Sequence, residues 1–113
     1  LAQRLQTSYP RIDVRTGPSD PADHDLVVNA TPMGMNEGDA LPMDVLRISP
    51  DAFVGEVVMK TEMTAFLQAA KNRGCRVQVG SDMLFEQIPA YLEYFGLPTT
   101  TAQVLRDVAQ LSY

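Results

Sequence analysis

Three short segments carry polar, glycine and methionine residues that could contact a ligand, and each follows a predicted strand. They are residues 29–35 (Asn-Ala-Thr-Pro-Met-Gly-Met), 57–60 (Val-Val-Met-Lys) and 80–83 (Gly-Ser-Asp-Met). In an open α/β sheet, ligands bind beyond the carboxyl ends of the strands. If the strands are parallel and adjacent, the three segments meet at one edge and could form a wall for a flat ring and its ribose.

Glycines and methionines would give this wall its properties. Gly34 and Gly80 allow the backbone to approach a ligand closely, and Met33, Met35 and Met83 would add soft, polarizable contacts. A plainer interpretation also fits, because Asn, Thr and Pro are common turn residues after a strand and methionines often fill cores. The pattern alone leaves both interpretations open.

Other kinds of site find little support in the sequence. Cys75 and His24 are the only cysteine and histidine, so neither a Cys/His metal site nor a Ser-His-Asp triad is predicted. The dinucleotide fingerprint G-x-G-x-x-G cannot be drawn from the seven glycines. The residues themselves therefore predict no metal ligand in this chain.

Composition narrows the class of protein. The 113 residues suit one small domain, and the 45% hydrophobic content is enough for a core. The net charge of −5 argues against nucleic acid or an anionic membrane surface as the main partner. No apolar stretch approaches the roughly 20 residues that span a bilayer. A single cysteine fits a reducing compartment, which favours the cytoplasm.

The first half of the chain predicts short elements separated by loops. Residues 1–8 favour a helix, and the alternation in residues 11–15 favours a strand. Residues 26–28 form a compact apolar run, typical of a strand buried on both faces. Residues 34–51 are rich in turn residues, with a short helical turn expected at residues 45–46.

The segment after residue 52 predicts a strand and an amphipathic helix. Residues 53–59 favour a strand, and Thr61 is a suitable N-cap for the helix that follows. Gly74 would end this helix as a C′ glycine. The helix would bury Met63, Phe66, Leu67 and Ala70, which lie at i, i+3, i+4 and i+7.

The last third predicts one more strand and two helices. Residues 77–79 alternate as a strand does, and Ser81 or Asp82 would cap the next helix, which Pro89 should kink or split. Thr100 has capping-box spacing for a final helix. That helix would bury Val104, Leu105, Val108 and Leu111. Because strands alternate with helices, the fold class is α/β, with a parallel sheet flanked by helices.

The motifs at the strand ends, taken in order, resemble those of the shikimate dehydrogenase family. Residues 29–35 resemble its N-A-T-P-x-G-M signature, and residues 79–87 (Val-Gly-Ser-Asp-Met-Leu-Phe-Glu-Gln) resemble its later G-x-x-M-L-x-x-Q motif. Residues 56–64 stand where that family has a strand ending in D-x-x-Y-x-P-x-x-T. The resemblance covers nearly the whole chain. It implies that residues 1–113 are the C-terminal part of an NADP-binding, Rossmann-like domain.

The resemblance also implies roles for particular positions. The residues that would contact the nicotinamide end of NADP are Asn29, Ala30, Thr31, Met33, Val57, Gly80 and Met83. Val57 and Gly80 would do so through their backbones. Gln87 would face the substrate and hydrogen-bond its hydroxyls. Without the resemblance, Gln87 would be interpreted as a solvated helix position.

The chain departs from the family pattern at three positions. Met59 stands where the family usually has a tyrosine that contacts the substrate, Thr61 replaces a proline, and Glu56 replaces an aspartate. A site that lacks one polar partner discriminates differently among hydroxylated substrates. The expected substrate is therefore shikimate, quinate or a related hydroxylated cyclic acid, and the chain is expected to be a divergent paralogue.

The resemblance places several essential parts outside these residues. The family's catalytic Lys and Asp belong to an N-terminal substrate domain, and its glycine-rich loop belongs to the first βαβ unit. By this alignment Lys60 and Asp82 do not replace the catalytic pair: Lys60 is interpreted as a surface charge and Asp82 as a helix cap. The resemblance therefore implies no catalytic residue in this chain, which alone is expected to be inactive. Without the first strands, the strand predicted at residues 11–15 would expose its edge, which predicts self-association or disorder of residues 1–25.

Three functional hypotheses follow. The leading hypothesis is that this chain is part of an NADP-dependent shikimate or quinate dehydrogenase-like oxidoreductase, which would serve aromatic amino-acid biosynthesis. The second is a non-catalytic binding or assembly module of the same fold. The third is an oxidoreductase that acts on another substrate, such as an amino-acid derivative.

Overall fold

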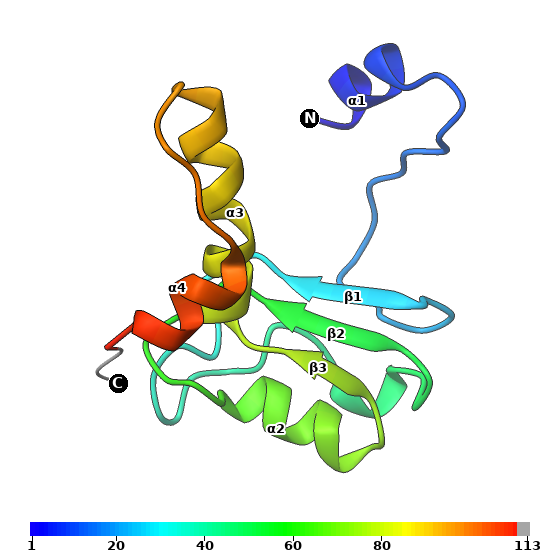
Figure 1. Ribbon diagram of the computed structural model, residues 1–113. Coiled ribbons are helices and arrows are strands. Elements are labelled where there is room, and N and C mark those ends of the chain that lie inside the picture. Colours follow the sequence, from blue (N-terminus) through cyan, green and yellow to red (C-terminus); the bar gives the residue numbers. More distant parts are fainter. Residues whose placement is uncertain (111–113) are drawn as a thin grey trace.

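A three-stranded parallel sheet forms the centre of the molecule, for which a computed structural model describes residues 1–110 (Figure 1). The strands are β1 (Leu26–Asn29), β2 (Phe53–Glu56) and β3 (Arg76–Gln78), in the order β1-β2-β3. The register aligns Val27 with Val54, and Val54 with Val77. The predicted α/β class with a parallel sheet is confirmed.

Residues 1–110 also form four α-helices and one 3₁₀ helix. They are α1 (Ala2–Ser8), η1 (Val45–Arg47), α2 (Ala65–Asn72), α3 (Gly80–Tyr94) and α4 (Ala102–Val108). Figure 1 shows α2 beneath one face of the sheet, and α3 beginning near the carboxyl ends of the strands. The helical turn expected at residues 45–46 is confirmed as η1, which Asp44 caps by accepting from the Leu46 amide.

The core lies on the α2 side of the sheet. Val54, Phe66 and Leu67 are fully buried there, and full burial of such a side chain is worth about 1.5–3 kcal/mol. The buried residues that make up the core are Val27, Val45, Ile48, Ala52, Val54, Phe66, Leu67, Ala70 and Cys75. The predicted apolar face of α2 is confirmed for Phe66, Leu67 and Ala70, while Met63 packs against the core from before the helix.

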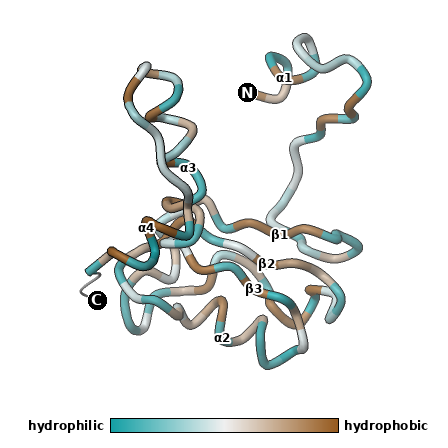
Figure 2. The backbone as a smooth tube through the Cα atoms, in the orientation of Figure 1, coloured by the Kyte–Doolittle hydropathy of each residue, from teal (hydrophilic) through white to brown (hydrophobic). Residues whose placement is uncertain are grey.

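The opposite face of the sheet is open. Leu26 is 60% exposed and Val28 is 50% exposed, so the prediction that β1 is buried on both faces is wrong. Side chains alternate between the two faces of a strand, and α2 covers only the face that carries Val27. Figure 2 shows that most of β1 consists of apolar residues.

The N-terminal segment stands apart from the sheet. The helix at residues 1–8 is confirmed as α1, which buries no residue. The strand predicted at residues 11–15 is wrong, because no strand forms there and Ile12 is 54% exposed. Instead Gln6 holds this segment locally, accepting from the Val14 amide at 3.1 Å and donating to the Ile12 carbonyl at 2.7 Å. A strand without a ladder partner has nothing to stabilise it.

Two predicted helix caps lie at neighbouring threonines instead. Thr64, and not Thr61, caps α2 by accepting from the Leu67 amide at 3.3 Å. Thr101, and not Thr100, caps α4 by accepting from the Val104 amide at 3.2 Å. In each case the capping threonine lies three residues before the amide that donates the hydrogen bond to it, as N-cap geometry requires. Gly74 follows the end of α2 with φ of +99°, so the predicted C′ glycine is confirmed.

Helix α3 also differs from expectation at its start and middle. Its N-cap is Val79, which makes no side-chain capping bond, so the predicted Ser81 or Asp82 cap is wrong. The helix runs through Pro89 to Tyr94 without being split. It ends as predicted near Gly96, whose φ is +67°.

Helix α4 and the end of β2 also differ from the sequence prediction. No described residue of α4 is buried, and Val108 is 69% exposed, so the predicted apolar burial by this helix is wrong; Leu111 lies outside the described residues. Strand β2 stops at Glu56, before the predicted end at residue 59. The chain there leaves the ladder and turns toward α2.

Candidate functional site at the carboxyl ends of the strands

Asn29 ends β1 and organises the loop that follows it. Its side chain is buried, with 1% exposed. The amide Nδ2 donates to the Met33 carbonyl at 3.1 Å, and Oδ1 accepts from the Thr31 amide and hydroxyl at 3.1 and 2.7 Å. Ala30, Thr31 and Met33 are exposed on this loop. The Asn29 side chain therefore fixes the loop's shape, and the outer surface of the loop is free for a ligand.

Glu56 ends β2 directly beside Asn29 in the register. Its side chain is 3% exposed, and neither carboxylate oxygen has a hydrogen-bond partner among residues 1–110. Burial of a carboxylate without partners is costly. Glu56 is thus a buried polar residue without a hydrogen-bond partner, at the carboxyl end of β2.

Gly80 brings the start of α3 against the end of β2. A Cβ atom at Gly80 would lie 2.1 Å from the Val58 carbonyl oxygen and 3.1 Å from the Val57 carbonyl carbon. No side chain fits in that space, so only glycine permits this approach. The structure therefore places Gly80 against the backbone of Val57 and Val58, at the carboxyl end of β2.

The two loops at this edge are tied to each other. Lys60 Nζ donates to Asn36 Oδ1 at 2.5 Å, which joins the segment after β2 to the segment after β1. Between these loops and the start of α2 lies a hollow of about 250 Å³. Its lining comes from residues 34–39, from Thr61 and from residues 63–65. Met59, which is 50% exposed, leads into this segment.

Helix α3 presents two different faces. Asp82 and Glu86 both pair with Arg106 of α4, at 3.0 and 2.7 Å. These carboxylates raise the pKa of Arg106, chiefly through the Glu86 hydrogen bond. Met83 and Gln87, one and two turns beyond Gly80, are half-buried. The acidic residues of α3 therefore serve the contact with α4, while Met83 and Gln87 remain available to a ligand.

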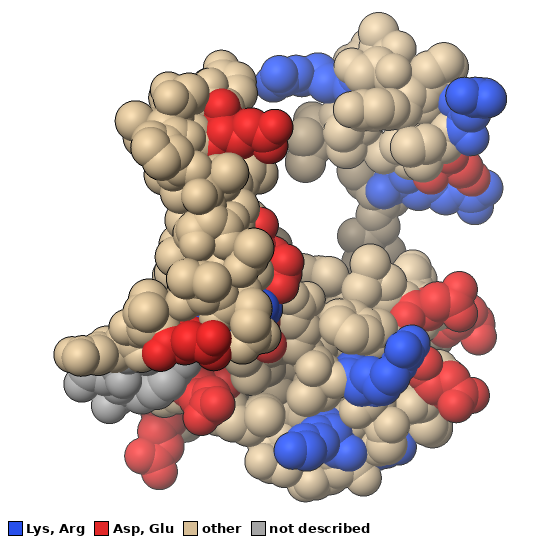
Figure 3. All heavy atoms as spheres, in the orientation of Figure 1, with Lys and Arg blue, Asp and Glu red and all other residues tan. Residues whose placement is uncertain are grey.

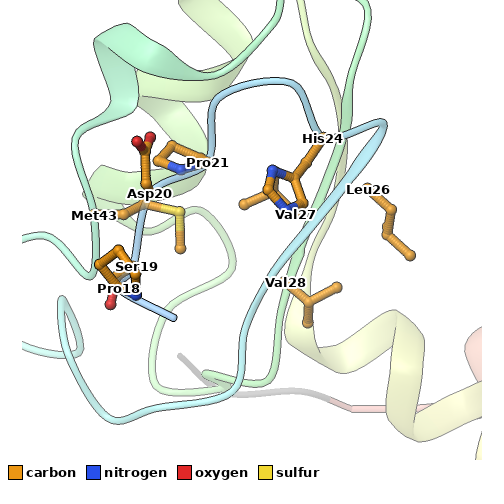
Figure 4. Close-up of a pocket in the computed structure, with 9 residues that line it drawn as sticks. All are labelled: Pro18, Ser19, Asp20, Pro21, His24, Leu26, Val27, Val28 and Met43. Atoms are coloured by element: carbon orange, nitrogen blue, oxygen red, sulfur yellow. The ribbon is translucent and has the colours of Figure 1, made fainter. Parts of the chain in front are cut away.

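A second pocket, of about 180 Å³, lies along the free edge of β1 (Figure 4). Its lining residues are Pro18, Ser19, Asp20, Pro21, His24, Leu26, Val27, Val28 and Met43. The loop beside it is held by a bidentate pair in which Arg47 donates to Asp20 twice, at 2.8 Å each. This guanidinium lowers the pKa of Asp20 to about 2. Because the pocket is not at the carboxyl ends of the strands, we do not place the functional site here.

Two residues of the site were missed by sequence reasoning about side chains. Glu56 was noted only as a replacement, although an acidic residue inside an apolar strand was itself a signal. Tyr91 was given no role from the sequence, yet it is 54% exposed and donates to Gln87. Its spacing of four residues from Gln87 was the available signal.

Residues 1–110 contain neither a candidate membrane-spanning helix nor a candidate metal-binding cluster. No helix in this range is long and apolar enough to cross a bilayer. The same residues contain no cluster of three or more His, Cys, Asp or Glu side chains that could hold a metal ion.

Comparison with known proteins places this geometry in a family. No family model matches the chain. It is 37% identical over 90 residues to the shikimate dehydrogenase (NADP(+)) of Acidiphilium cryptum, covering 78% of this chain and 33% of that protein. Among solved structures, shikimate 5-dehydrogenase from Thermus thermophilus, in complex with NADP(H) and shikimate, superposes with a TM-score of 0.70 at 26% identity, covering 96% of this chain and 42% of that one.

A quinate dehydrogenase extends the match. The enzyme from Corynebacterium glutamicum, in complex with NAD, is 35% identical with a TM-score of 0.62, covering 75% of this chain and 30% of that one. The parallel sheet flanked by helices, together with these structural neighbours, makes this a Rossmann-like α/β protein. Within that class, the chain belongs to the shikimate dehydrogenase family. It spans about a third of the length of the Acidiphilium cryptum enzyme and about two fifths of that of the Thermus thermophilus enzyme.

Proposed function

We propose that this chain is part of an NADP-dependent oxidoreductase that acts on shikimate, quinate or a related hydroxylated alicyclic acid. In the forward direction a hydride would leave the carbon that bears one hydroxyl, and the hydroxyl proton would leave to a base, giving the ketone. NADP, when bound, supplies the hydride acceptor. The observation that carries this proposal is the close approach of Gly80 to the Val57–Val58 backbone, in a chain that matches this family.

The residues of this chain would bind and orient the reactants. Val57 and Gly80 would offer backbone groups to the nicotinamide end of NADP, and the loop that Asn29 fixes would pass beside the ribose. Met83 would add apolar contact, and Gln87 would donate to an oxygen of the substrate. Holding two reactants in the right geometry can itself supply a large share of the rate enhancement.

We further propose that residues 1–113 are the C-terminal part of the NADP-binding domain and do not catalyse the reaction alone. No residue described here is assigned as a catalytic acid or base. The support is the length of the relatives, of which this chain spans 33% in one case and 42% in another. A cytoplasmic location is proposed with it, from the single cysteine.

The test is an assay of the 113-residue chain beside the protein as its gene encodes it. Each is mixed with NADP⁺ and with shikimate or quinate, and formation of reduced cofactor is followed by absorbance. We expect turnover by the gene product and none by the chain. Turnover of neither acid by the gene product would overturn the proposed function.

A second candidate is a non-catalytic binding module of the same fold. It is favoured by Met59, which brings no hydroxyl to the site. Binding of NADP⁺ by the gene product, measured by calorimetry, without turnover of any hydroxylated acid would select this candidate. We also propose that the free edge of β1 supports self-association, for which the uncovered sheet face is the observation.

A further inference from the structure

Two polar side chains on α3 form a hydrogen-bonded pair. The Tyr91 hydroxyl donates to Gln87 Oε1 at 3.0 Å. Gln87 is half-buried and Tyr91 is 54% exposed, so the pair borders solvent. The next tyrosine of the helix, Tyr94, is 83% exposed and contacts the Phe95 ring edge-on.

The pair lies on the side of α3 that starts at the strand ends. Successive residues of an α-helix are rotated by about 100°, which puts Gln87 and Tyr91 on the same side as Gly80. Asp82 and Glu86 fall on the opposite side, where both bind Arg106. Because Gly80 packs against the Val58 carbonyl, the Gln87–Tyr91 side of α3 continues outward from the candidate site.

The hydrogen bond decides which end of the Gln87 amide a ligand meets. A glutamine amide has an acceptor oxygen and an NH₂ group with two donors. Because Oε1 is turned toward the Tyr91 hydroxyl, the NH₂ group is the end of the amide that faces away from Tyr91 and toward a ligand. Without the Tyr91 hydroxyl, the amide can rotate and offer either end.

We propose that Tyr91 is a positioning residue that holds the Gln87 NH₂ group toward the substrate. The pair then selects a ligand with acceptor oxygens, namely the hydroxyl or carboxylate oxygens of a small alicyclic acid. Met59 brings no hydroxyl to the candidate site, whereas Tyr91 has one, and it acts through Gln87. This inference rests on the proposed function, in which Gln87 contacts the substrate.

The first experiment tests the pair without any activity. In the ¹⁵N-labelled 113-residue chain, the Gln87 side-chain NH₂ resonances are compared between wild type, Tyr91→Phe and Tyr94→Phe. Tyr94→Phe is the matched control, since it removes a phenol hydroxyl from the same helix outside the pair. We expect Tyr91→Phe to shift or broaden the Gln87 resonances and Tyr94→Phe to leave them unchanged. Equal spectra for the two variants would overturn the proposal.

The second experiment tests the consequence for the substrate. Steady-state kinetics of the gene-encoded protein with shikimate and with quinate should show KM raised about threefold to tenfold by Tyr91→Phe, the scale of one neutral hydrogen bond. The kcat value and the KM for NADP⁺ should stay within about twofold, and Gln87→Ala should remove the effect of Tyr91→Phe. A KM for both acids equal to wild type would overturn the positioning role.

The two experiments also separate two kinds of failure. If wild-type protein oxidises neither acid, the proposed function fails and the substrate role of Tyr91 is overturned with it. The NMR comparison still shows whether the Tyr91–Gln87 pair exists. If the acids are oxidised and Tyr91→Phe behaves like Tyr94→Phe, only the Tyr91 inference fails.

Discussion

At the residue scale, Gly80 is the position with the least room for change. An added Cβ would meet backbone atoms of Val58, which cannot rotate away as the end of a side chain can. We predict that Gly80→Ala lowers the free energy of unfolding by about 1–3 kcal/mol or more, the range for overpacking. Urea unfolding followed by circular dichroism measures this. Gly17→Ala is the control, because nothing lies within 4 Å of its Cβ position, and equal midpoints for both variants would contradict the prediction.

Glu56 poses the opposite problem, a buried carboxyl group with no hydrogen-bond partner among the described residues. Glutamine has the same shape but no charge, so Glu56→Gln should raise the free energy of unfolding of the 113-residue chain by about 1 kcal/mol at pH 7. Glu93→Gln, at an exposed position of α3, should change it little. Loss of stability in Glu56→Gln would show that the carboxylate has a partner that this structure does not contain.

At the element scale, the start of α2 separates sequence pattern from geometry. Thr61 and Thr64 both precede the helix, but only Thr64 accepts from the Leu67 amide, and only Thr64 is buried. We predict that Thr64→Ala costs about 1 kcal/mol or more of stability, while Thr61→Ala stays near zero. Denaturant unfolding of the two variants measures the difference. A larger effect at Thr61 would place the cap where the sequence first suggested it.

The loop before β1 depends on one exposed ion pair. Arg47 lowers the pKa of Asp20 from 3.8 to about 2, so this pair contributes fully above about pH 4 and is lost as the pH falls through 2. We predict faster amide exchange in residues 18–24 as the pH falls over this window, relative to the intrinsic rates at each pH. In Asp20→Asn that extra rise should be absent, and its presence there would assign it to another group.

The same elements show why sequence reasoning succeeded in part. The alternation of strands and helices, the α2 face and the C′ glycine at Gly74 follow from local pattern and conformation, which a sequence carries directly. The strand at residues 11–15 failed because a strand requires a partner in space, and the apolar alternation of Ile12 and Val14 does not provide one. At the site, Val57 and Gly80 were predicted together through a motif, but the Tyr91–Gln87 bond depends on rotamers that no motif specifies.

At the scale of the whole molecule, apolar surface remains uncovered on one side of the sheet. α2 and η1 close one face, whereas Leu26 and Val28 stay exposed on the other. Within residues 1–110, no strand pairs with the outer edge of β1. Figure 3 shows basic side chains gathered over α1 and the segment after it, at a distance from the sheet. An unpaired strand edge beside apolar side chains is a template for pairing with another chain.

We therefore predict that the isolated 113-residue chain self-associates through β1. Val28→Lys places a charge on the uncovered face and should keep the chain monomeric, because lysine on an edge strand opposes pairing. Val104→Lys is the matched control, since Val104 on α4 is 49% exposed and Val28 is 50% exposed. Sedimentation velocity over a wide concentration range should show association for wild type and Val104→Lys, and a single monomeric species for Val28→Lys. A wild-type chain that stays monomeric at every concentration would refute the edge as an interface. Loss of association in both variants would show that added charge, and not the β1 edge, controls it.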